Sequence, residues 1–351
     1  MDDYGLYKPG ARILVVRLGA IGDCLRVCPA LRRLRRSRPE ATLGWAVEDR
    51  VYPLLAGHPD VDSFHVLRRS ALNAGGHRAI AEILRFSREL RSASYDLVLD
   101  FHGRFKSGLV SWLSGAPLRV GYAKGDSTEL NHWFMNQHVT LMDRWENRVL
   151  RFLHLLAPLG LNTAPDPGDM GIHVDASALE VATAVYEEAG RPAVALYPGC
   201  SAVRSRERWP AEKWVQLIAA LEAEGISSMI LWGPDEREFT WELAEACGAS
   251  QRLAPATSLQ EMLALTSLFR AYLGADTAAQ HMCWLQGVPS AVFTGPKPPR
   301  TVAPLPHVRS RVLRVERYYR EGESTRRQPL EVTTEVTVAE ALEAARYLLR
   351  D

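Results

Sequence analysis

The chain of 351 residues is longer than one hydrophobic core usually organises, which predicts two domains of ordinary size. Its apolar share of 47% and its charged share of 24% are those of a globular protein. Because 42 Lys and Arg residues balance 41 Asp and Glu residues, no overall field favours nucleic acid as a partner. No window approaches the roughly 18 to 20 apolar residues of a membrane span, so we expect any membrane contact to be peripheral.

The cysteines indicate the compartment. Five of them are scattered along the chain without metal-site spacing, and their number is odd. They are interpreted as small buried apolar groups. Together with an N-terminus that lacks a run of signal-peptide type, they predict a reducing, cytoplasmic environment.

In the first half of the chain, short apolar runs alternate with helical patterns. Strands are predicted at residues 13–16, 42–47, 64–67, 97–101 and 119–122, and helices after residue 22 and near 79–93 and 105–114. Pro29 should kink the first helix or limit its regular part. A longer helix is predicted from Asp143, as its N-cap, towards Gly160.

Residues 161–171 are rich in Pro, Gly and Asp and form the best linker, after which the alternation resumes. Strands are predicted at 193–197, 228–232, 271–274 and 290–293, and helices at 211–224, from about 235, from Ser258 and after 276. The chain therefore has an α/β pattern of two Rossmann-like domains, residues 1–165 and 166–351, each with a parallel sheet covered by helices. A last helix, at 338–350, can pack on either half, including back on the N-terminal domain.

Ligands of open α/β sheets bind where strands end and helices begin, so the first candidate site is the turn RLGAIGDCL, residues 17–25. Gly19 and Gly22 permit close approach of a ligand, but their spacing is not G-x-G-x-x-G, which disfavours a nicotinamide cofactor. Asp23 stands at the helix start. It is either a cap or first-turn carboxylate favoured by the helix dipole, or a general base displayed at the strand end.

Two loops of the second half have phosphate-binding character. Residues 197–210 contain Ser201, Arg206 and Arg208 before a Trp-Pro helix start, which suits either a diphosphate or a solvated basic loop. At Asp276 and Thr277 a helix begins directly after a strand. The backbone N–H groups of Thr277, Ala278 and Ala279 could therefore cradle phosphate oxygens. His281, one turn later, either faces the same phosphate or is structural.

A run of arginines follows the first turn, between Arg26 and Arg38, with no acidic residue before Glu40. It is either a solvated helix face or a site for an anionic acceptor or lipid headgroups, in which Arg32 and Arg35 would take part.

Several motifs in order resemble glycosyltransferase family 9, the ADP-heptose:LPS heptosyltransferases, over nearly the whole chain. They are RLGAIGD, DFHGRFKS at 100–107, the PG turn with its following WP, WGPDE at 232–236, and ADTAAQH with the downstream GVPSAVFTGP. The resemblance implies a GT-B fold whose sheets face a central cleft. It also implies inverting transfer of a heptose from ADP-heptose to Kdo or heptose of inner-core lipopolysaccharide.

The resemblance also assigns roles to residues. Asp23 matches the general base, and Asp276, Thr277 and His281 match the donor diphosphate site. Gly233 would lie near the nucleotide, and Gly22 is placed on the donor side. Lys106, with Arg104, matches the basic acceptor cleft. Helix dipole and cationic side chains can hold a diphosphate, so we expect no metal and no cofactor beyond the nucleotide sugar.

Three positions depart from the family pattern. Glu207 stands where Lys is usual, Ala278 where Gly is usual, and His102 where Gln is frequent, although Arg206 or Arg208 could supply the missing charge. Rival functions are a same-fold nucleotide-sugar epimerase and a nucleotide-sugar-binding protein without catalysis. The expected partners are a nucleotide sugar and an anionic glycolipid, with peripheral contact at the inner membrane and no nucleic acid.

Overall fold

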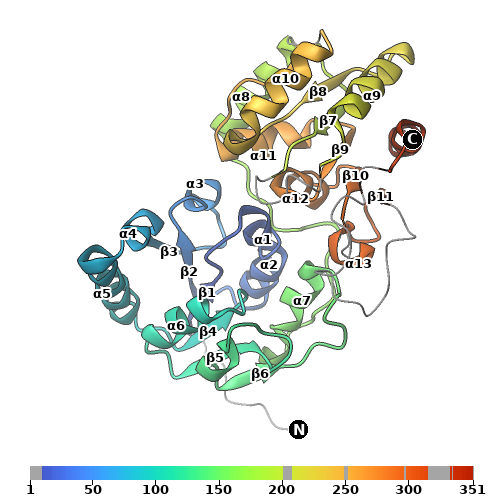
Figure 1. The fold of residues 1–351 in the computed structure, drawn as a ribbon. Coiled ribbons are helices and arrows are strands. Elements are labelled where there is room, and N and C mark those ends of the chain that lie inside the picture. The colour runs from blue at the N-terminus through green and yellow to red at the C-terminus, as the bar shows by residue number, and fades with distance from the viewer. Residues whose placement is uncertain are drawn as a thin grey trace. The chain divides into compact units, whose positions relative to one another are not determined.

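The chain folds as two units, Met1–His173 and Val174–Asp351, each built on one parallel sheet (Figure 1). The computed structural model describes residues 10–200, 208–248, 252–295, 298–314, 333 and 335–350. Within these residues, no helix is long and apolar enough to cross a bilayer.

The sheet of the first unit has six strands in the order β3-β2-β1-β4-β5-β6, which is a Rossmann order. Its strands are β1 (Arg12–Val16), β2 (Thr42–Glu48), β3 (Ser63–Leu67), β4 (Leu97–Asp100), β5 (Leu118–Tyr122) and β6 (Gln137–Val139). The central strands are almost continuously buried on both faces, as expected of parallel strands covered by helices.

Helices cover both faces of this sheet. They are α1 (Ile21–Leu25), α2 (Cys28–Ser37), α3 (Tyr52–Leu55), α4 (Arg69–Asn73), α5 (Gly76–Ser92), α6 (Phe105–Leu113) and α7 (Arg148–His154), with 3₁₀ turns η1 (Asn131–Phe134) and η2 (Ala157–Leu159). Pro29 lies in the first turn of α2, so the helix predicted after residue 22 is divided into α1 and α2. The predicted N-cap Asp143 was wrong: α7 begins after Asn147, whose side chain accepts from the Val149 N–H.

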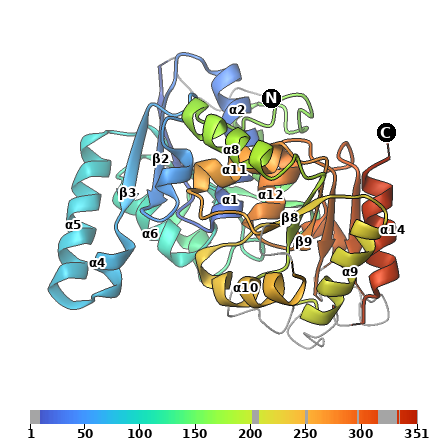
Figure 2. The same cartoon turned by 90° about the horizontal axis from the view of Figure 1, so that it is seen from above.

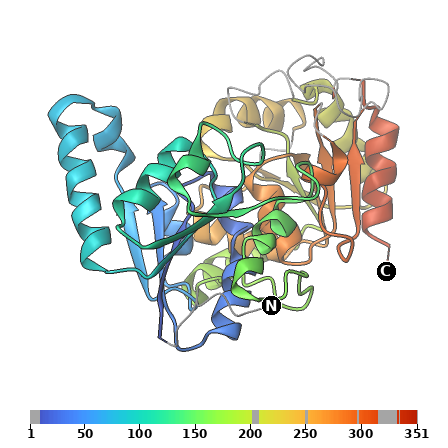
Figure 3. The ribbon, with the colours of Figure 1, turned by 90° about the horizontal axis from the view of Figure 1, so that it is seen from below.

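Helices α5 and α6 lie on the same face of the first sheet, because both belong to right-handed crossovers that run in the same direction across it. Their inner sides pack on the strands: Phe86 and Leu90 of α5 and Val110 of α6 share a core with Leu14 and Val98. Figure 3 shows α5, in cyan, beside the edge of the sheet.

The second unit has a sheet of five parallel strands in the order β11-β10-β9-β7-β8. They are β7 (Val194–Tyr197), β8 (Ser228–Ile230), β9 (Ala271–Ala275), β10 (Ser290–Phe293) and β11 (Ser310–Leu313). The helices are α8 (Ala176–Glu188), α9 (Ala211–Ala223), α10 (Arg237–Ala246), α11 (Leu259–Ser267), α12 (Ala278–Leu285), α13 (Pro299–Val302) and α14 (Val338–Leu348), with a 3₁₀ turn η4 (Pro234–Glu236).

The last helix, α14, packs beside α9 and against the second sheet (Figure 2). Ala341, Ala344, Ala345 and Leu348 are buried in the core of that unit. Of the two halves that the sequence left open, α14 therefore covers the second.

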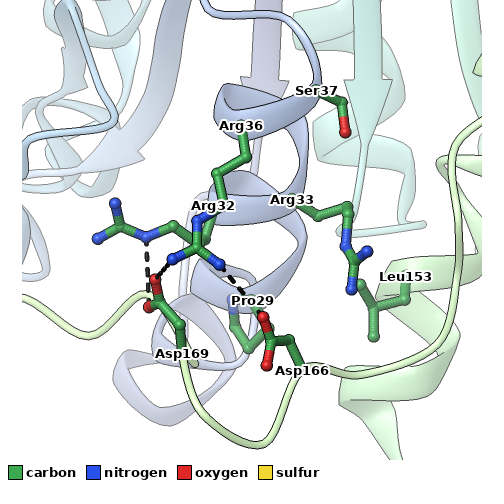
Figure 4. Close-up of a pocket in the computed structure, with 8 residues that line it drawn as sticks. All are labelled: Pro29, Arg32, Arg33, Arg36, Ser37, Leu153, Asp166 and Asp169. Atoms are coloured by element: carbon green, nitrogen blue, oxygen red, sulfur yellow. Dashed lines mark hydrogen bonds and ion pairs between the residues drawn. The ribbon is translucent and has the colours of Figure 1, made fainter.

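The arginines of α2 bind the segment that leads to the second unit (Figure 4). Arg36 pairs with Asp166 at 3.2 Å and Asp169 at 2.5 Å, and Arg32 lies 3.4 Å from Asp169. These side chains border a small pocket of about 120 Å³. Much of the segment 161–171, which the sequence predicts as a linker, is thus attached to the first unit.

Gly171 brings this segment into direct contact with α2. Its φ is +67°, and a Cβ there would lie 2.7 Å from the carbonyl oxygen of Cys28 and 2.8 Å from Cβ of Arg32. His58 also donates from Nε2 to the Gly171 carbonyl, at 2.8 Å. The close approach therefore depends on the absence of a side chain.

Gly171→Ala should destabilise the first unit more than Gly160→Ala. Both positions have positive φ, at which Ala costs roughly 1–2 kcal/mol, but a Cβ on Gly160 meets nothing within 4 Å. The clash at Gly171 should add about 1–3 kcal/mol. Urea unfolding followed by circular dichroism measures both variants, and equal losses would contradict the close packing.

Candidate functional site

Asp23 lies in the first turn of α1, directly after the turn that follows β1, and its carboxylate is bound by arginines. Arg17 contacts one oxygen, Arg26 reaches the other at 2.7 Å, and Arg148 lies 2.9 Å and 3.1 Å from the two. The N-cap of α1 is Ala20, so Asp23 is not the cap. Three guanidinium groups favour the ionised carboxylate that a general base requires.

These arginines come from three parts of the first unit. Arg17 is buried, donates to the carbonyl of Phe101 at 3.0 Å and lies over the ring of Phe152. Arg26 is held by its bond to the Gly22 carbonyl. Arg148 begins α7, and its side chain is 39% exposed, so it is the member of the group most open to a substrate.

A second carboxylate, Glu48 at the end of β2, collects three more cations. Lys106 lies 2.5 Å from Glu48, Arg50 lies 3.1 Å away and Arg69 lies 3.5 Å away. Glu48 is buried, whereas the three cations are each 42% to 51% exposed, so the group presents positive charge to solvent. The sequence indicated only Lys106, because the other members come from segments without a motif.

Gly19 connects these two groups. A Cβ at Gly19 would lie 3.2 Å from a guanidinium nitrogen of Arg50 and 3.5 Å from a carboxylate oxygen of Glu48. The turn that carries Asp23 thus passes beside the Glu48 group. The carboxyl ends of β1 and β2 form one polar, cationic region, as expected for a ligand site of this fold.

His102 follows β4 beside the same turn. Its Nδ1 accepts a hydrogen bond from the Leu18 N–H at 3.3 Å, which places the proton of the neutral ring on Nε2. Burial, and then the charge of Arg17, lowers the pKa of His102 to about 3. His102 is therefore a neutral hydrogen-bond donor at ordinary pH.

The other predicted acceptor residues lie in different environments. Arg104 is largely exposed and lies 3.8 Å from Glu129. Arg32 pairs with Asp60 at 3.0 Å, and Arg35 pairs with Asp62 at 2.6 Å. Arg32 and Arg35 are therefore each paired with a carboxylate of the same unit, in contrast to the exposed cations around Glu48.

In the second unit, Asp276 and Thr277 lie between β9 and α12, as predicted, with Thr277 as the N-cap residue. The backbone N–H groups of Ala278 and Ala279 follow in the first turn. The Thr277 hydroxyl is buried beside the Tyr272 hydroxyl, without a hydrogen bond of standard geometry among the described residues.

His281 is buried on the inner side of α12. Its Nδ1 accepts from the indole N–H of Trp284 at 3.0 Å, and its Nε2 lies 3.6 Å from Asp276. The ring thereby links Asp276 to the helix. This geometry suits positioning of Asp276.

Glu236 is a candidate that the sequence analysis did not single out within WGPDE. Its buried carboxyl accepts from the Tyr197 hydroxyl at 3.2 Å, and burial raises its pKa. A Cβ on Gly233 would lie 2.7 Å from a Glu236 oxygen, and one on Gly199 would lie 2.5 Å from its Cγ. Glycines after β7 and β8 thus make room for this carboxyl at the strand ends.

A cavity of about 510 Å³ lies after β8, along α10. Trp232 and Trp241 line it with their rings 4.9 Å apart and nearly perpendicular, and Arg237 lies over Trp241. The indole N–H of Trp232 donates to the Ala254 carbonyl at 2.7 Å, which fixes the ring. The volume and the aromatic walls suit a flat heterocycle.

The loop before α9 is only partly described. Ser201 and Arg206 lie outside the described residues, as does Glu207. Arg208 donates to the Cys200 carbonyl at 2.9 Å and lies 4.8 Å from the ring centroid of Phe239.

In the part of the chain that the structure describes, no group of three or more His, Cys, Asp or Glu side chains is arranged to hold a metal ion.

Known proteins show the same architecture. The family model of glycosyltransferase family 9 (heptosyltransferase) matches residues 83–330, more than half of the chain. Lipopolysaccharide heptosyltransferase 1 of Campylobacter coli is 25% identical over 300 residues, 82% of this chain and 84% of that protein. The predicted family resemblance is confirmed.

Solved structures agree in fold. A family 9 glycosyl transferase from Veillonella parvula has a TM-score of 0.80 at 20% identity, covering 98% of this chain and 99% of that one. The E. coli heptosyltransferase WaaC with ADP has a TM-score of 0.77 at 21% identity, covering 96% and 99%. The predicted GT-B fold is confirmed.

The depressed pKa of His102 predicts a pH-dependent stability. His102 titrates at about 3 in the fold against 6.5 ordinarily, so the unfolded chain binds the proton first as pH falls. The folded state therefore keeps its full stability at pH values above the ordinary histidine pKa of 6.5. It loses stability as the pH falls from 6.5 towards 3. Between pH 7 and pH 5, the wild type should lose about 2 kcal/mol more than His102→Gln.

Urea unfolding at the two pH values measures this difference, with His77→Gln at an exposed position as the control. Equal pH dependence in wild type and His102→Gln would show that His102 is not held neutral.

Proposed function

We propose, since the chain belongs to glycosyltransferase family 9, that it transfers a heptose from ADP-heptose to an inner-core lipopolysaccharide acceptor. The chain is a glycosyltransferase; the proposal concerns its donor, acceptor and residues. Relatives named lipopolysaccharide heptosyltransferase, and the WaaC structure with ADP, support it. The observation that carries it is a carboxylate paired with three guanidinium groups at one strand-end site, with a phosphate-type helix start at another.

Asp23 acts as the general base in this proposal. An inverting transfer needs a group that accepts the proton of the acceptor hydroxyl as the new glycosidic bond forms. Asp23 is paired with arginines, lies at a strand end and is 13% exposed, so a hydroxyl can reach it. His102, with its proton on Nε2, can donate to another oxygen of the acceptor.

The second unit binds the donor. The N-terminus of α12, with Thr277 and Asp276, faces the developing charge of the leaving diphosphate, and Arg208 adds a cation. The cavity lined by Trp232 and Trp241 takes the base, and Glu236 accepts from the ribose hydroxyls. Helix dipole and guanidinium charge support metal-independent transfer.

The acceptor binds the first unit through its negative charge. The Glu48 group leaves Arg50, Arg69 and Lys106 partly exposed beside the Asp23 turn. A carboxylate such as that of Kdo, or a phosphate, would pair with these cations. Arg104 lies two residues before Lys106 and can extend the same site.

ADP should stabilise the full-length protein more than UDP or GDP. At a ligand concentration 100 times Kd, binding adds about 2.7 kcal/mol to stability. Trp232→Leu should weaken ADP binding about tenfold or more, because a stacking face is removed, whereas Trp232→Phe should retain most of it. Calorimetric titration with and without EDTA measures both, with Trp133→Leu in the first unit as the control. Preference for UDP or GDP would overturn the donor assignment.

Asp23→Asn should lower turnover by about 100- to 10,000-fold, the usual cost of losing a positioned base. Steady-state transfer assays with Kdo-bearing acceptor measure it. Asp60→Asn is the matched control, because it also removes a buried carboxylate paired with arginine in the same unit. Its turnover should stay near that of the wild type, although both variants lose stability. Retention of more than about a tenth of turnover by Asp23→Asn would place the base elsewhere.

A further inference from the structure

Large apolar side chains gather on the outer side of the helices that cover one face of the first sheet. Six of them are between 38% and 71% exposed: Ile80, Ile83, Leu84, Phe105, Trp112 and Trp133. We call this the α5–α6 surface. Among its described residues, the second unit exposes fewer such side chains, chiefly Leu179 and Val181 of α8.

The pattern is built into the helices. Ile80, Ile83 and Leu84 follow helical spacing on α5, and Phe105 and Trp112 are two turns apart on α6, so each set shares one face. The core of the unit already takes Phe86 and Leu90 from α5 and Val110 from α6. The outer apolar residues are therefore not needed for packing within the unit.

Helix α5, helix α6 and the 3₁₀ turn η1, which carry these side chains, are neighbours in the fold. Helix α5 contacts α6, and Arg91 donates to the Leu113 carbonyl at the end of α6, at 3.1 Å. Helix α6 contacts η1, where the rings of Phe105 and Phe134 are 5.2 Å apart. Apolar surface of this extent indicates an interaction site.

The charge around this surface is mainly basic. Arg78, Arg88 and Arg91 are exposed on α5. The acidic residues of that helix, Glu82 and Glu89, both bind Arg85. Arg104 adds a further exposed cation beside Phe105, with Glu129 at 3.8 Å.

We propose that the α5–α6 surface docks on an anionic lipid bilayer. Aliphatic and tryptophan side chains bordered by arginine are the chemistry of helices that lie in the membrane interface. Anionic headgroups pair with the arginines while the apolar side chains enter the acyl boundary. A second copy of the chain fits less well, because a two-fold interface would bring the same arginines together.

Helix α6 also connects the α5–α6 surface to the cationic group around Glu48. The consequence for the reaction rests on the proposed function. The first turn of α6 exposes Phe105, while the next residue, Lys106, reaches Glu48 at the strand ends. One helical turn thus joins the bilayer contact to the cationic site. A lipid-linked acceptor held there would keep its acyl chains in the membrane.

Vesicle sedimentation of the full-length protein tests the proposal without donor or acceptor, so its outcome does not depend on the proposed reaction. The probes are vesicles of phosphatidylglycerol with phosphatidylethanolamine, and neutral vesicles of phosphatidylcholine. The variant Ile80→Ser/Leu84→Ser/Trp112→Ser should bind anionic vesicles at least about tenfold more weakly than wild type. Leu179→Ser/Val181→Ser on α8 is the matched control and should bind like wild type.

A second variant, Arg78→Gln/Arg88→Gln, leaves the apolar residues in place and should weaken binding to anionic vesicles and its dependence on salt. Thermal melts establish that each variant is folded. Unchanged binding in both variants, or equal binding of wild type to neutral vesicles, would overturn the proposal. So would a dimer of the wild type that the triple variant abolishes, because the surface would then be an interface between copies.

Discussion

The ion pairs around Asp23 determine how the first unit presents its site. Three guanidinium groups converge on one carboxylate from the end of β1, the end of α1 and the start of α7. Removing one partner of a buried ion pair is costly, since it leaves a charge uncompensated. The three ion pairs of Asp23 therefore hold the turn after β1, helix α1 and helix α7 in one arrangement. This arrangement positions the other polar groups of the site.

Ion pairs between basic side chains and carboxylates have different roles elsewhere in this unit. On α2, arginines pair with Asp60, Asp62, Asp166 and Asp169. These ion pairs attach the loop before β3 and the segment before the second unit to the helix. Around Glu48, three cations share one carboxylate, and positive charge remains exposed. An anionic acceptor is therefore expected at the strand ends. The arginine-rich helix has a structural task.

The sequence located most strands within one or two residues, because buried parallel strands are short apolar runs. It missed the edge strands β6, which has three residues and an exposed His138, and β11. It also missed α8, whose buried residues are only Ala178 and Ala182. It also missed Glu48 and Glu236. Their partners are far away in sequence, and the glycines that make room for Glu236 have meaning only in three dimensions.

The arginines around Asp23 have two opposite effects on a proposed base. Guanidinium groups keep a carboxylate ionised, but they also weaken its hold on a proton, which a base must accept. Arg17 and Arg26 are nearly buried, at 6% and 10% exposure, whereas Arg148 is 39% exposed. In the proposed mechanism, an acceptor anion that pairs with Arg148 would compete with Asp23 for this guanidinium group, while Arg17 and Arg26 would keep the carboxylate in place. Binding of the acceptor would then open one side of the proposed base to the acceptor hydroxyl.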